Sequence, residues 1–186
     1  MAEMLARAAI CTEWIPDVAG GELAFEQDRY GKPYLAGQPE VQFNLSHSGR
    51  WCVCAVSTVP VGVDVEQARP MDLAWTHKFL SAEEREDLRA TEDSVRLWRF
   101  YELWTRKECY AKALGRGLTP ELLAVSVTEG EAEALIPYRI RSSRLDDSHP
   151  AAVCAAMPEL RADWSVWTQE EIAARLLRRS YMNERG

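Results

Sequence analysis

The chain has 186 residues, of which 47% are hydrophobic, and a formal net charge of −7 at pH 7. This length fits one medium domain or two small halves packed together, and the apolar content is that of a folded protein rather than a disordered one. The acidic balance argues against nonspecific binding to nucleic acid, so no nucleic-acid partner is expected. The first residues fit no secretory signal and no apolar run approaches membrane-spanning length, so we expect a cytoplasmic protein with no membrane partner.

The five cysteines are scattered, at positions 11, 52, 54, 109 and 154. Cys52 and Cys54 fall on one face of a predicted strand, but no second pair at zinc-site spacing accompanies them. We therefore expect all five to be small, buried hydrophobic side chains in a reducing compartment.

Taken in chain order, the first elements are a short helix over residues 4–14, which Pro16 ends, and a loop at G31-K-P33. Three short strands separated by turns follow, a pattern that predicts one antiparallel sheet. Antiparallel strands favour an α+β class over repeated βαβ units. The predicted strands span residues 42–46, 51–56 and 61–66.

The second part of the chain begins with helices. Ser81 and Glu84 form a candidate capping box for a helix to about Arg89, and a longer helix spans residues 94–115 with Gly115 at its C-terminal end. An amphipathic helix is expected near the C-terminus. The order helix, strands, helix, strands suggests two related halves joined near Arg69 and Pro70. The remaining predicted elements are strands at 122–127, 134–140, 151–156 and 164–167 and the C-terminal helix at 169–181.

The strand V61-G-V-D-V-E66 carries two acids two residues apart. Because successive side chains of a strand point to opposite faces, Asp64 and Glu66 share a face with Gly62. The valines at 61, 63 and 65 take the other face, which must be core. Two adjacent carboxylates beside a glycine are a poor way to stabilise a strand, and they indicate a cation site.

The long helix carries an acid within an apolar stripe. Burying an unpaired carboxylate costs several kcal/mol, so Glu108 should have a partner. One interpretation is a half-buried salt bridge with Lys112, one turn further on. The other is that Glu108 faces Asp64 and Glu66 across a hard divalent cation, for which magnesium is the best match to oxygen ligands. The stripe recurs at spacings of four and three and consists of Leu97, Tyr101, Trp104, Glu108 and Ala111.

Charge on the same helix supports an anion site. Residues 96–116 contain six basic residues against two acidic ones, in a chain that is acidic overall. The sharper interpretation is an acidic ligand or an acidic partner protein, and the plainer one is a solvated helix face. On the sharper interpretation, Lys107, Lys112 and His47 could donate to phosphates near the cation. The basic residues are Arg96, Arg99, Arg106, Lys107, Lys112 and Arg116.

These motifs, in this order, resemble the 4′-phosphopantetheinyl transferases of the surfactin-synthetase-activating type. The resemblance implies an α+β fold of two similar halves related by a pseudo-two-fold, residues 1–69 and 70–186, that form one catalytic unit with coenzyme A in the cleft between them. It also implies magnesium-dependent transfer of the phosphopantetheine arm of coenzyme A to a serine of a carrier protein, with release of 3′,5′-ADP. The motifs are G31-K-P33, F43-N-L-S-H-S-G-R-W51, G62-V-D-V-E66 and W104-T-R-K-E-C-Y-A-K112.

The resemblance also implies roles for individual residues. The metal ligands are Asp64, Glu66 and Glu108, holding magnesium or, alternatively, manganese, and these acids with Lys112 form the catalytic group. The base is Glu108 or a metal-bound water that it orients. The coenzyme A contacts carried over are Lys32 and Pro33 toward the adenosine and 3′-phosphate, Ser46, His47 and Lys112 toward the phosphates, and Lys107 in the signature helix. Taken without the family, His47 is more typical of a hydrogen-bonded surface residue in a turn.

This chain differs from the family in the segment that precedes the first matching motif. Members of this type usually begin with a further strand and helix that carry basic residues for the 3′-phosphate, so we expect the first half to be truncated here, with Arg7 or Arg29 as substitutes. A monomer is expected from the two-half organisation. The resemblance implies that the partner is an acyl or peptidyl carrier protein of fatty acid, polyketide or nonribosomal peptide biosynthesis, and the basic helix would attract the acidic helix that either kind presents.

Two other functions remain open. One is a non-catalytic module that binds coenzyme A or a carrier protein, although the complete trio of Asp64, Glu66 and Glu108 argues against decay of the site. The other is a magnesium-dependent pyrophosphohydrolase, which would use the same acids on water but lacks the usual glutamate-rich helix.

Overall fold

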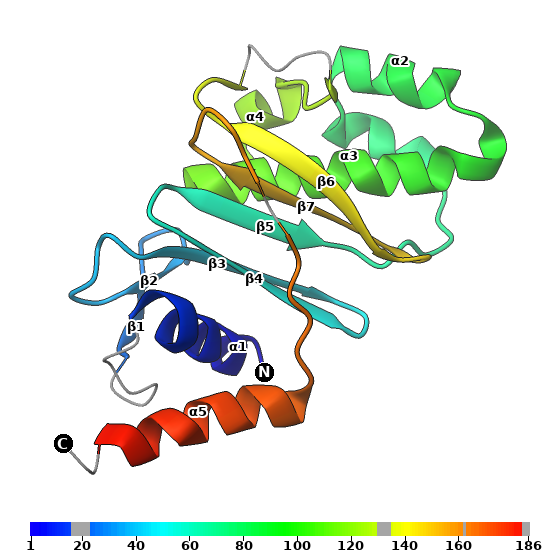
Figure 1. Cartoon of the computed structure of the whole chain (residues 1–186). Helices are drawn as coiled ribbons and strands as arrows, with labels where there is room; N and C mark the ends of the chain where they lie inside the picture. The colour runs from blue at the N-terminus through cyan, green and yellow to red at the C-terminus, as the bar shows by residue number, and fades with distance from the viewer. Residues whose placement is uncertain (16–22, 130–134, 162, 184–186) are drawn as a thin grey trace.

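The computed structural model describes residues 1–15, 23–129, 135–161 and 163–183 and has a mixed α+β fold (Figure 1). The helices are α1 (Ala2–Ala9), α2 (Ala82–Ala90), α3 (Asp93–Leu114), α4 (Pro120–Ala124) and α5 (Gln169–Asn183), with a π-helical turn η1 (Ile10–Trp14) and a 3₁₀ helix η3 (Leu73–Phe79). The strands are β1 (Phe25–Gln27), β2 (Pro33–Leu35), β3 (Gln42–Ser48), β4 (Trp51–Ser57), β5 (Val61–Val65), β6 (Arg139–Asp146) and β7 (His149–Ala155).

These strands form three antiparallel sheets, β1–β2, β3–β4 and β5–β7–β6. The prediction of one sheet over residues 42–66 is therefore wrong, because β5 leaves the β3–β4 hairpin and pairs with β7. All seven residues of β7 are buried, so both of its edges need backbone partners, and β5 supplies one of them. The valine face of β5 is core, as the sequence predicts: Val63 and Val65 pack with Val53 of β4 and Ala151 and Val153 of β7.

Side chains of β3, rather than its backbone, join β5 to the hairpin. Three backbone N–H groups along β5 and its extension donate to alternate β3 side chains, and we call this set the β3–β5 ladder. Each β3 side chain satisfies a β5 donor on the edge that β7 does not pair, and the ladder thereby connects the two larger sheets. Its bonds are Val63 N to Asn44 Oδ1 at 3.0 Å, Val65 N to Ser46 Oγ at 3.4 Å and Gln67 N to Ser48 Oγ at 2.9 Å.

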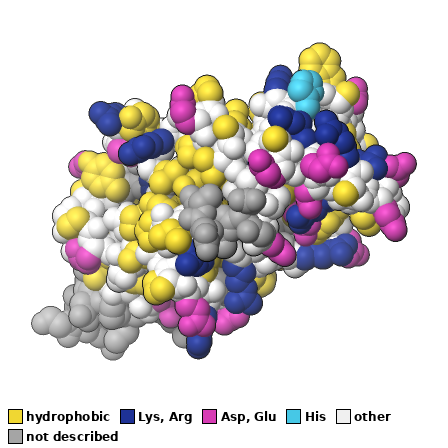
Figure 2. Space-filling view, turned by 90° about the horizontal axis from the view of Figure 1, so that it is seen from above, with side chains coloured by type: hydrophobic (Ala, Val, Ile, Leu, Met, Phe, Trp, Pro, Cys, Tyr) yellow, Lys and Arg dark blue, Asp and Glu magenta, His cyan; other side chains and the backbone are white. Residues whose placement is uncertain are grey.

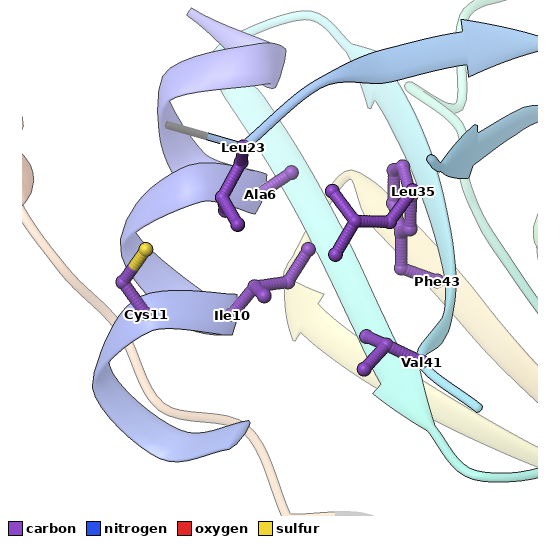
Figure 3. Packing of buried hydrophobic residues seen from close by; sticks show 7 residues of the cluster. All are labelled: Ala6, Ile10, Cys11, Leu23, Leu35, Val41 and Phe43. Carbon is purple, nitrogen blue, oxygen red and sulfur yellow. The ribbon is translucent and has the colours of Figure 1, made fainter. Parts of the chain in front are cut away.

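Helix α1 and the turn η1 cover the β3–β4 hairpin. Ala6 and Ile10 pack with Leu35, Val41 and Phe43 in a cluster that Figure 3 shows from close by. Burying one large apolar side chain of this kind stabilises the fold by about 1.5–3 kcal/mol. The predicted helix over residues 4–14 is confirmed, while Pro16, its predicted stop, lies outside the described residues. Helix α5 then packs beside α1 (Figure 1).

Helix α3 lies across the three-stranded sheet. Cys109 and Ala113 pack on Ala152 and Cys154 of β7, where small side chains allow a close approach. Its other side packs toward α2 and the segment before it, through Phe100 and Leu103 among others. Because two faces of α3 are covered, the predicted stripe is only partly right. Of its members only Ala111 is buried, and Leu97, Tyr101, Trp104 and Glu108 are half-buried.

Local signals around the helices were reliable. Ser81 and Glu84 form the predicted capping box of α2, and Gly115 ends α3 with a left-handed φ of 67°. The strand predicted at 122–127 is wrong: Thr119 caps a short helix there, with Pro120 in its first turn. No strand forms at 164–167, and β6 begins at Arg139, whereas residue 134 lies outside the described part. Among the described residues no helix is long and apolar enough to cross a membrane.

Candidate active site

The site begins where α3 crosses β5, and Gly62 makes that crossing possible. A Cβ at Gly62 would lie 2.0 Å from the carbonyl oxygen of Cys109 and 2.4 Å from the nitrogen of Ala113. Only glycine lets the helix backbone come this near. The glycine face of β5 is therefore filled by α3, and the close approach places Glu108 of the helix near the two acids of the strand.

Asp64 is the most deeply buried of these acids, with 3% of its surface exposed. Its Oδ1 accepts hydrogen bonds from Ser46 Oγ at 2.8 Å and from Lys112 Nζ at 2.6 Å. Its Oδ2 is buried and has no hydrogen-bond partner among the described residues. Burial raises the pKa of Asp64, Lys112 and Ser46 oppose that shift, and Glu66 adds to it. One oxygen of this carboxylate is thus held firmly while the other remains available.

Glu66 and Glu108 complete a cluster of three carboxylates, which we call the acid cluster. Glu66 Oε2 accepts from Ser48 Oγ at 3.0 Å. Burial, followed by the charge of Asp64, raises the pKa of Glu108 to about 7, with a further upward contribution from Glu66 and a downward one from Lys112. Burial of the side chain is the larger cause of this shift, and the neighbouring carboxylates add to it because like charges at close range disfavour ionisation.

Lys112 is directed at Asp64 rather than forming the salt bridge with Glu108 that spacing alone suggested. Besides the bond to Asp64, its Nζ donates to the backbone oxygen of Val63 at 3.3 Å. The structure therefore brings Lys112, Asp64, Glu66 and Glu108 to one place. Among the described residues, however, no group of three His, Cys, Asp or Glu side chains is already arranged to hold a metal ion.

Comparisons with known proteins identify the family of the chain. A family profile described as the 4′-phosphopantetheinyl transferase superfamily matches residues 60–169, which contain both β5 and α3. The chain belongs to that superfamily. This confirms the resemblance found in the sequence and the transferase class of enzyme that it implied.

Individual relatives of the superfamily extend the match over most of the chain. A 4′-phosphopantetheinyl transferase of Bacillus subtilis is 36% identical over 178 residues, which cover 91% of this chain and 79% of the relative. The 4′-phosphopantetheinyl transferase Sfp of Bacillus subtilis strain 168 is 32% identical over 180 residues, covering 92% and 80% respectively. The 4′-phosphopantetheinyl transferase HetI of a Nostoc strain is 35% identical over 125 residues, covering 63% and 53%.

Within the superfamily motifs, Ser46 and His47 have different surroundings. Ser46 is buried, and its hydroxyl both donates to Asp64 and accepts from the β5 backbone in the β3–β5 ladder. His47, the next residue on the strand, faces the opposite side and is exposed. Ser46 thus positions Asp64 directly, whereas His47 stands where a ligand could reach it.

Lys32 of the G31-K-P33 motif links the first part of the chain to the C-terminal end of α3. Its Nζ donates to the carbonyl oxygen of Lys112 at 2.8 Å and to those of Val61 and Ala113 at 3.3 Å. A cation at this position stabilises the negative end of the helix dipole. Burial lowers the pKa of Lys32, and Asp28 opposes the shift. Pro33 begins β2 directly after it.

Lys107, which the resemblance placed at the coenzyme A site, lies away from the acid cluster. It is 1% exposed and pairs with Glu84 of α2, which is fully buried, at 2.9 Å. Its Nζ also donates to the backbone oxygens of Leu123 and Val125. The lysine preceding Glu108 in the signature helix therefore has a structural environment, holding α2 and the segment after α4 against α3.

Most of the basic side chains of α3 likewise form ion pairs or hydrogen bonds within the protein. Arg99 pairs with Asp87 at 2.7 Å and with Glu102 at 3.3 Å, and Arg106 donates to the carbonyl oxygen of Val127. Figure 2 shows the face seen from above, where basic and acidic side chains lie next to one another. The basic stretch is thus largely neutralised, and the prediction of a docking site for acidic groups rests on fewer cations than the sequence suggested.

Sequence reasoning missed the roles of Asn44 and Ser48. Both belong to the β3–β5 ladder, and Ser48 also donates to Glu66. The signal was available in the alternation of residues 44, 46 and 48, which are all polar on a strand whose other face carries Phe43 and Leu45. A polar face on an inner strand needs partners, and here β5 provides them.

Proposed function

We propose that this chain transfers the 4′-phosphopantetheine arm of coenzyme A to a serine hydroxyl of an acyl or peptidyl carrier protein and releases 3′,5′-ADP. The observation that carries the proposal is the acid cluster at the crossing of β5 and α3, in which Glu108 has a pKa of about 7. Phosphoryl transfer needs positioned charge and a base rather than elaborate covalent chemistry, and the cluster offers both.

The donor set fits a hard divalent cation. Asp64 Oδ2 is buried without a partner among the described residues, and burial together with the other acids raises the pKa of Glu108 to about 7. Asp64, Glu66 and Glu108 would hold the ion through oxygen atoms, a donor set suited to magnesium and also to manganese. When bound, the cation would supply positive charge to the pyrophosphate oxygens and to the departing group.

Glu108 is the proposed base. Its carboxyl belongs to the acid cluster, and in its ionised form it can take the proton of the carrier serine. The serine oxygen then bonds to the phosphorus that bears the pantetheine arm. The bond from that phosphorus to the bridging oxygen breaks, and 3′,5′-ADP leaves with the electron pair. Lys112, tethered to Asp64 at 2.6 Å, adds positive charge beside the phosphates.

The adenosine end of coenzyme A is proposed to occupy a groove of about 650 Å³ between the G31-K-P33 loop and the end of α3. Arg29, Lys32 and Arg116 line it and offer positive charge to a 3′-phosphate. Tyr30 lines the same groove and is 56% exposed, so its ring can contact the base. His47, exposed at the far end of β3, is proposed as a phosphate contact.

We further propose that the halves 1–69 and 70–186 are related by a pseudo-two-fold and act as one catalytic unit. The hairpins β3–β4 and β6–β7 are both antiparallel, each with a helix against it, α1 on the first and α3 on the second. The halves share secondary structure, since β5 of the first pairs with β7 of the second. Neither half would complete the acid cluster alone.

The test is release of 3′,5′-ADP from coenzyme A, measured with magnesium and an apo carrier protein. Glu108→Gln keeps the shape of the side chain and removes the base, so the rate should fall by about 10²–10⁴-fold. Glu102→Gln, on the same helix but paired with Arg99, is the matched control and should keep most of the rate. Failure of the folded wild-type chain to release 3′,5′-ADP would contradict the proposal, and coenzyme A binding alone would favour a non-catalytic module.

A further inference from the structure

The ends of two hairpins that are far apart in the sequence meet at one carboxylate. The β3–β4 hairpin turns at Gly49 and Arg50, between the paired residues Ser48 and Trp51. The β6–β7 hairpin turns between the paired residues Asp146 and His149. Asp146 Oδ2 accepts from Arg50 Nη2 at 2.7 Å and from Trp51 Nε1 at 2.8 Å. We call Arg50, Trp51, Asp146 and His149 the hairpin latch.

Asp146 is fully engaged on its other oxygen as well. Oδ1 accepts from the backbone nitrogen of Ser148 at 2.8 Å and from its Oγ at 3.1 Å, and it is hydrogen-bonded to His149 Nδ1 at 2.8 Å. The bonds from Trp51, His149 and Ser148, with that from Arg50, hold the pKa of Asp146 well below its usual range. The carboxylate therefore stays charged throughout the neutral range. Its Oδ2 accepts hydrogen bonds from the β3–β4 hairpin, and its Oδ1 is hydrogen-bonded within the β6–β7 hairpin.

The two turns are also in steric contact. Gly49 has a left-handed φ of 56°, and a Cβ there would lie 2.5 Å from His149 Nε2 and 3.0 Å from Gln67 Oε1. The side chain of His149 is thus wedged between its bond to Asp146 and the Gly49 backbone. Its Nε2 is buried with no hydrogen-bond partner in the described part of the chain, so packing rather than a hydrogen bond fixes the position of this end of the ring.

The latch lies next to residues that hold the acid cluster. Ser48, directly before Gly49, accepts from the backbone nitrogen of Gln67 at 2.9 Å and donates to Glu66 Oε2 at 3.0 Å. On the other side of β5, the nitrogen of Glu66 donates to the Pro150 oxygen at 3.1 Å, one residue beyond His149. Glu66 is therefore held between the two hairpins whose turns Asp146 fastens together.

We propose that Asp146 is a positioning residue for the transferase site: by joining the two hairpin turns it fixes Ser46 and Ser48 against β5, and so fixes Asp64 and Glu66. The catalytic consequence rests on the proposed function, whereas the structural consequence does not. Without the latch, the bonds that the described residues make between the end of β3 and β5 are those of the β3–β5 ladder and those from Ser46 and Ser48 to the two carboxylates, and short side chains make all of them.

The test compares Asp146→Ala with Asp147→Ala in the full chain. Asp147 is the next residue of the same turn, is fully exposed and pairs only weakly with Arg144 at 3.1 Å, so it is a matched control. The rate of hydrogen–deuterium exchange in a peptide covering residues 63–68 measures how well the backbone N–H groups of the β3–β5 ladder are protected, and it does not require activity. Asp146→Ala should speed exchange of the slow amides there by about tenfold, and Asp147→Ala should not.

The kinetic arm measures 3′,5′-ADP release against magnesium concentration. Asp146→Ala should lower kcat by about tenfold to a hundredfold and raise the magnesium concentration needed for half-maximal rate, with KM for the carrier unchanged, because misplaced acids rather than a lost docking contact are responsible. Equal exchange in the two variants, or faster exchange with unchanged kcat and magnesium dependence, would overturn the proposal.

Milder variants keep the test valid if Asp146→Ala unfolds. Trp51→Phe retains an aromatic ring but removes the Nε1 donor, and Asp146→Asn retains the shape without the charge. Both should move exchange and kcat in the same direction as Asp146→Ala and by less. Should the wild-type chain release no 3′,5′-ADP at all, the proposed function fails, and the exchange comparison alone decides whether Asp146 orders β5.

Discussion

At the scale of single residues, Gly62 decides whether the site can form at all. Any side chain there meets backbone atoms of Cys109 and Ala113, which cannot move without shifting α3. We expect Gly62→Ala to lower the free energy of unfolding by about 1–3 kcal/mol, as overpacking does elsewhere, and to reduce transfer activity more than tenfold. Urea unfolding and 3′,5′-ADP release measure the two effects. Unchanged stability would show that α3 does not pack on β5 this closely.

The raised pKa of Glu108 has a consequence for stability in metal-free buffer. Its pKa in the folded chain is about 7, above the ordinary 4.5, so the folded state holds a proton that the unfolded state has released between these values. Stability should therefore be highest below pH 4.5 as far as this group is concerned, and fall as pH rises toward 7. Because the side chain is only half-buried, we expect a loss of about 1–2 kcal/mol.

The variant that tests this is Glu108→Gln, unfolded by urea at several pH values with a chelator present. Glutamine cannot ionise, so the variant should gain stability relative to wild type as pH rises through this window, whereas Glu102→Gln should not. A difference between Glu108→Gln and wild type that does not change with pH would contradict the raised pKa.

At the scale of elements, the buried pair of Lys107 and Glu84 joins α3 to α2. Glu84 also accepts from the backbone nitrogens of Ser81 and Val127. Lys107→Met leaves the Glu84 carboxylate without its cation, and we expect a loss of about 3–5 kcal/mol. Adding Glu84→Gln removes the buried charge, so the double variant should be more stable than the sum of the single effects predicts, by about 0.5–3 kcal/mol. Strictly additive losses in urea unfolding would show that the pair is not coupled.

The sequence predicted elements well where the signal is local and poorly where it depends on distant partners. The capping box at Ser81 and the end of α3 at Gly115 follow from backbone chemistry within a few residues, and both are confirmed. The partner of β5 could not be read in the same way, because β7 lies about 90 residues further along the chain and its burial sets the pairing. Residues 122–127 were read as a strand from their apolar content, but Thr119 and Pro120 start a helix there.

The same division holds within the candidate site. Asp64, Glu66 and Glu108 could be grouped from the face they share and from an acid in an apolar stripe. Lys107 was assigned to the coenzyme A site because it directly precedes Glu108 in the signature helix. Adjacent residues of a helix point about 100° apart, however, and Lys107 therefore meets a different partner, Glu84. Ser46 was expected to face a phosphate, yet its hydroxyl is used to hold Asp64.

At the scale of the whole molecule, the acid cluster exists only because two sheets and one helix converge. Asp64 and Glu66 come from β5, Glu108 and Lys112 from α3, and the serines that hold the acids from β3. A ligand that binds all of these parts should stabilise the folded chain as a unit. We expect magnesium at about a hundred times its dissociation constant to add about 2.7 kcal/mol to the free energy of unfolding.

Asp64→Asn is the comparison for that effect, because it keeps the bond to Ser46 possible and removes a ligand charge. The gain from magnesium in urea unfolding should be absent in Asp64→Asn and present in Glu102→Gln. An equal gain in all three chains would place the ion elsewhere on the protein.

The measurement that tests the central claim most directly is the intact mass of an apo carrier protein after incubation with this chain, coenzyme A and magnesium. The account predicts that the carrier gains the mass of one phosphopantetheine arm, that a carrier with its target serine changed to alanine gains nothing, and that Glu108→Gln in the enzyme abolishes the gain. An unchanged carrier mass, from a chain shown to be folded and to bind magnesium, would contradict it.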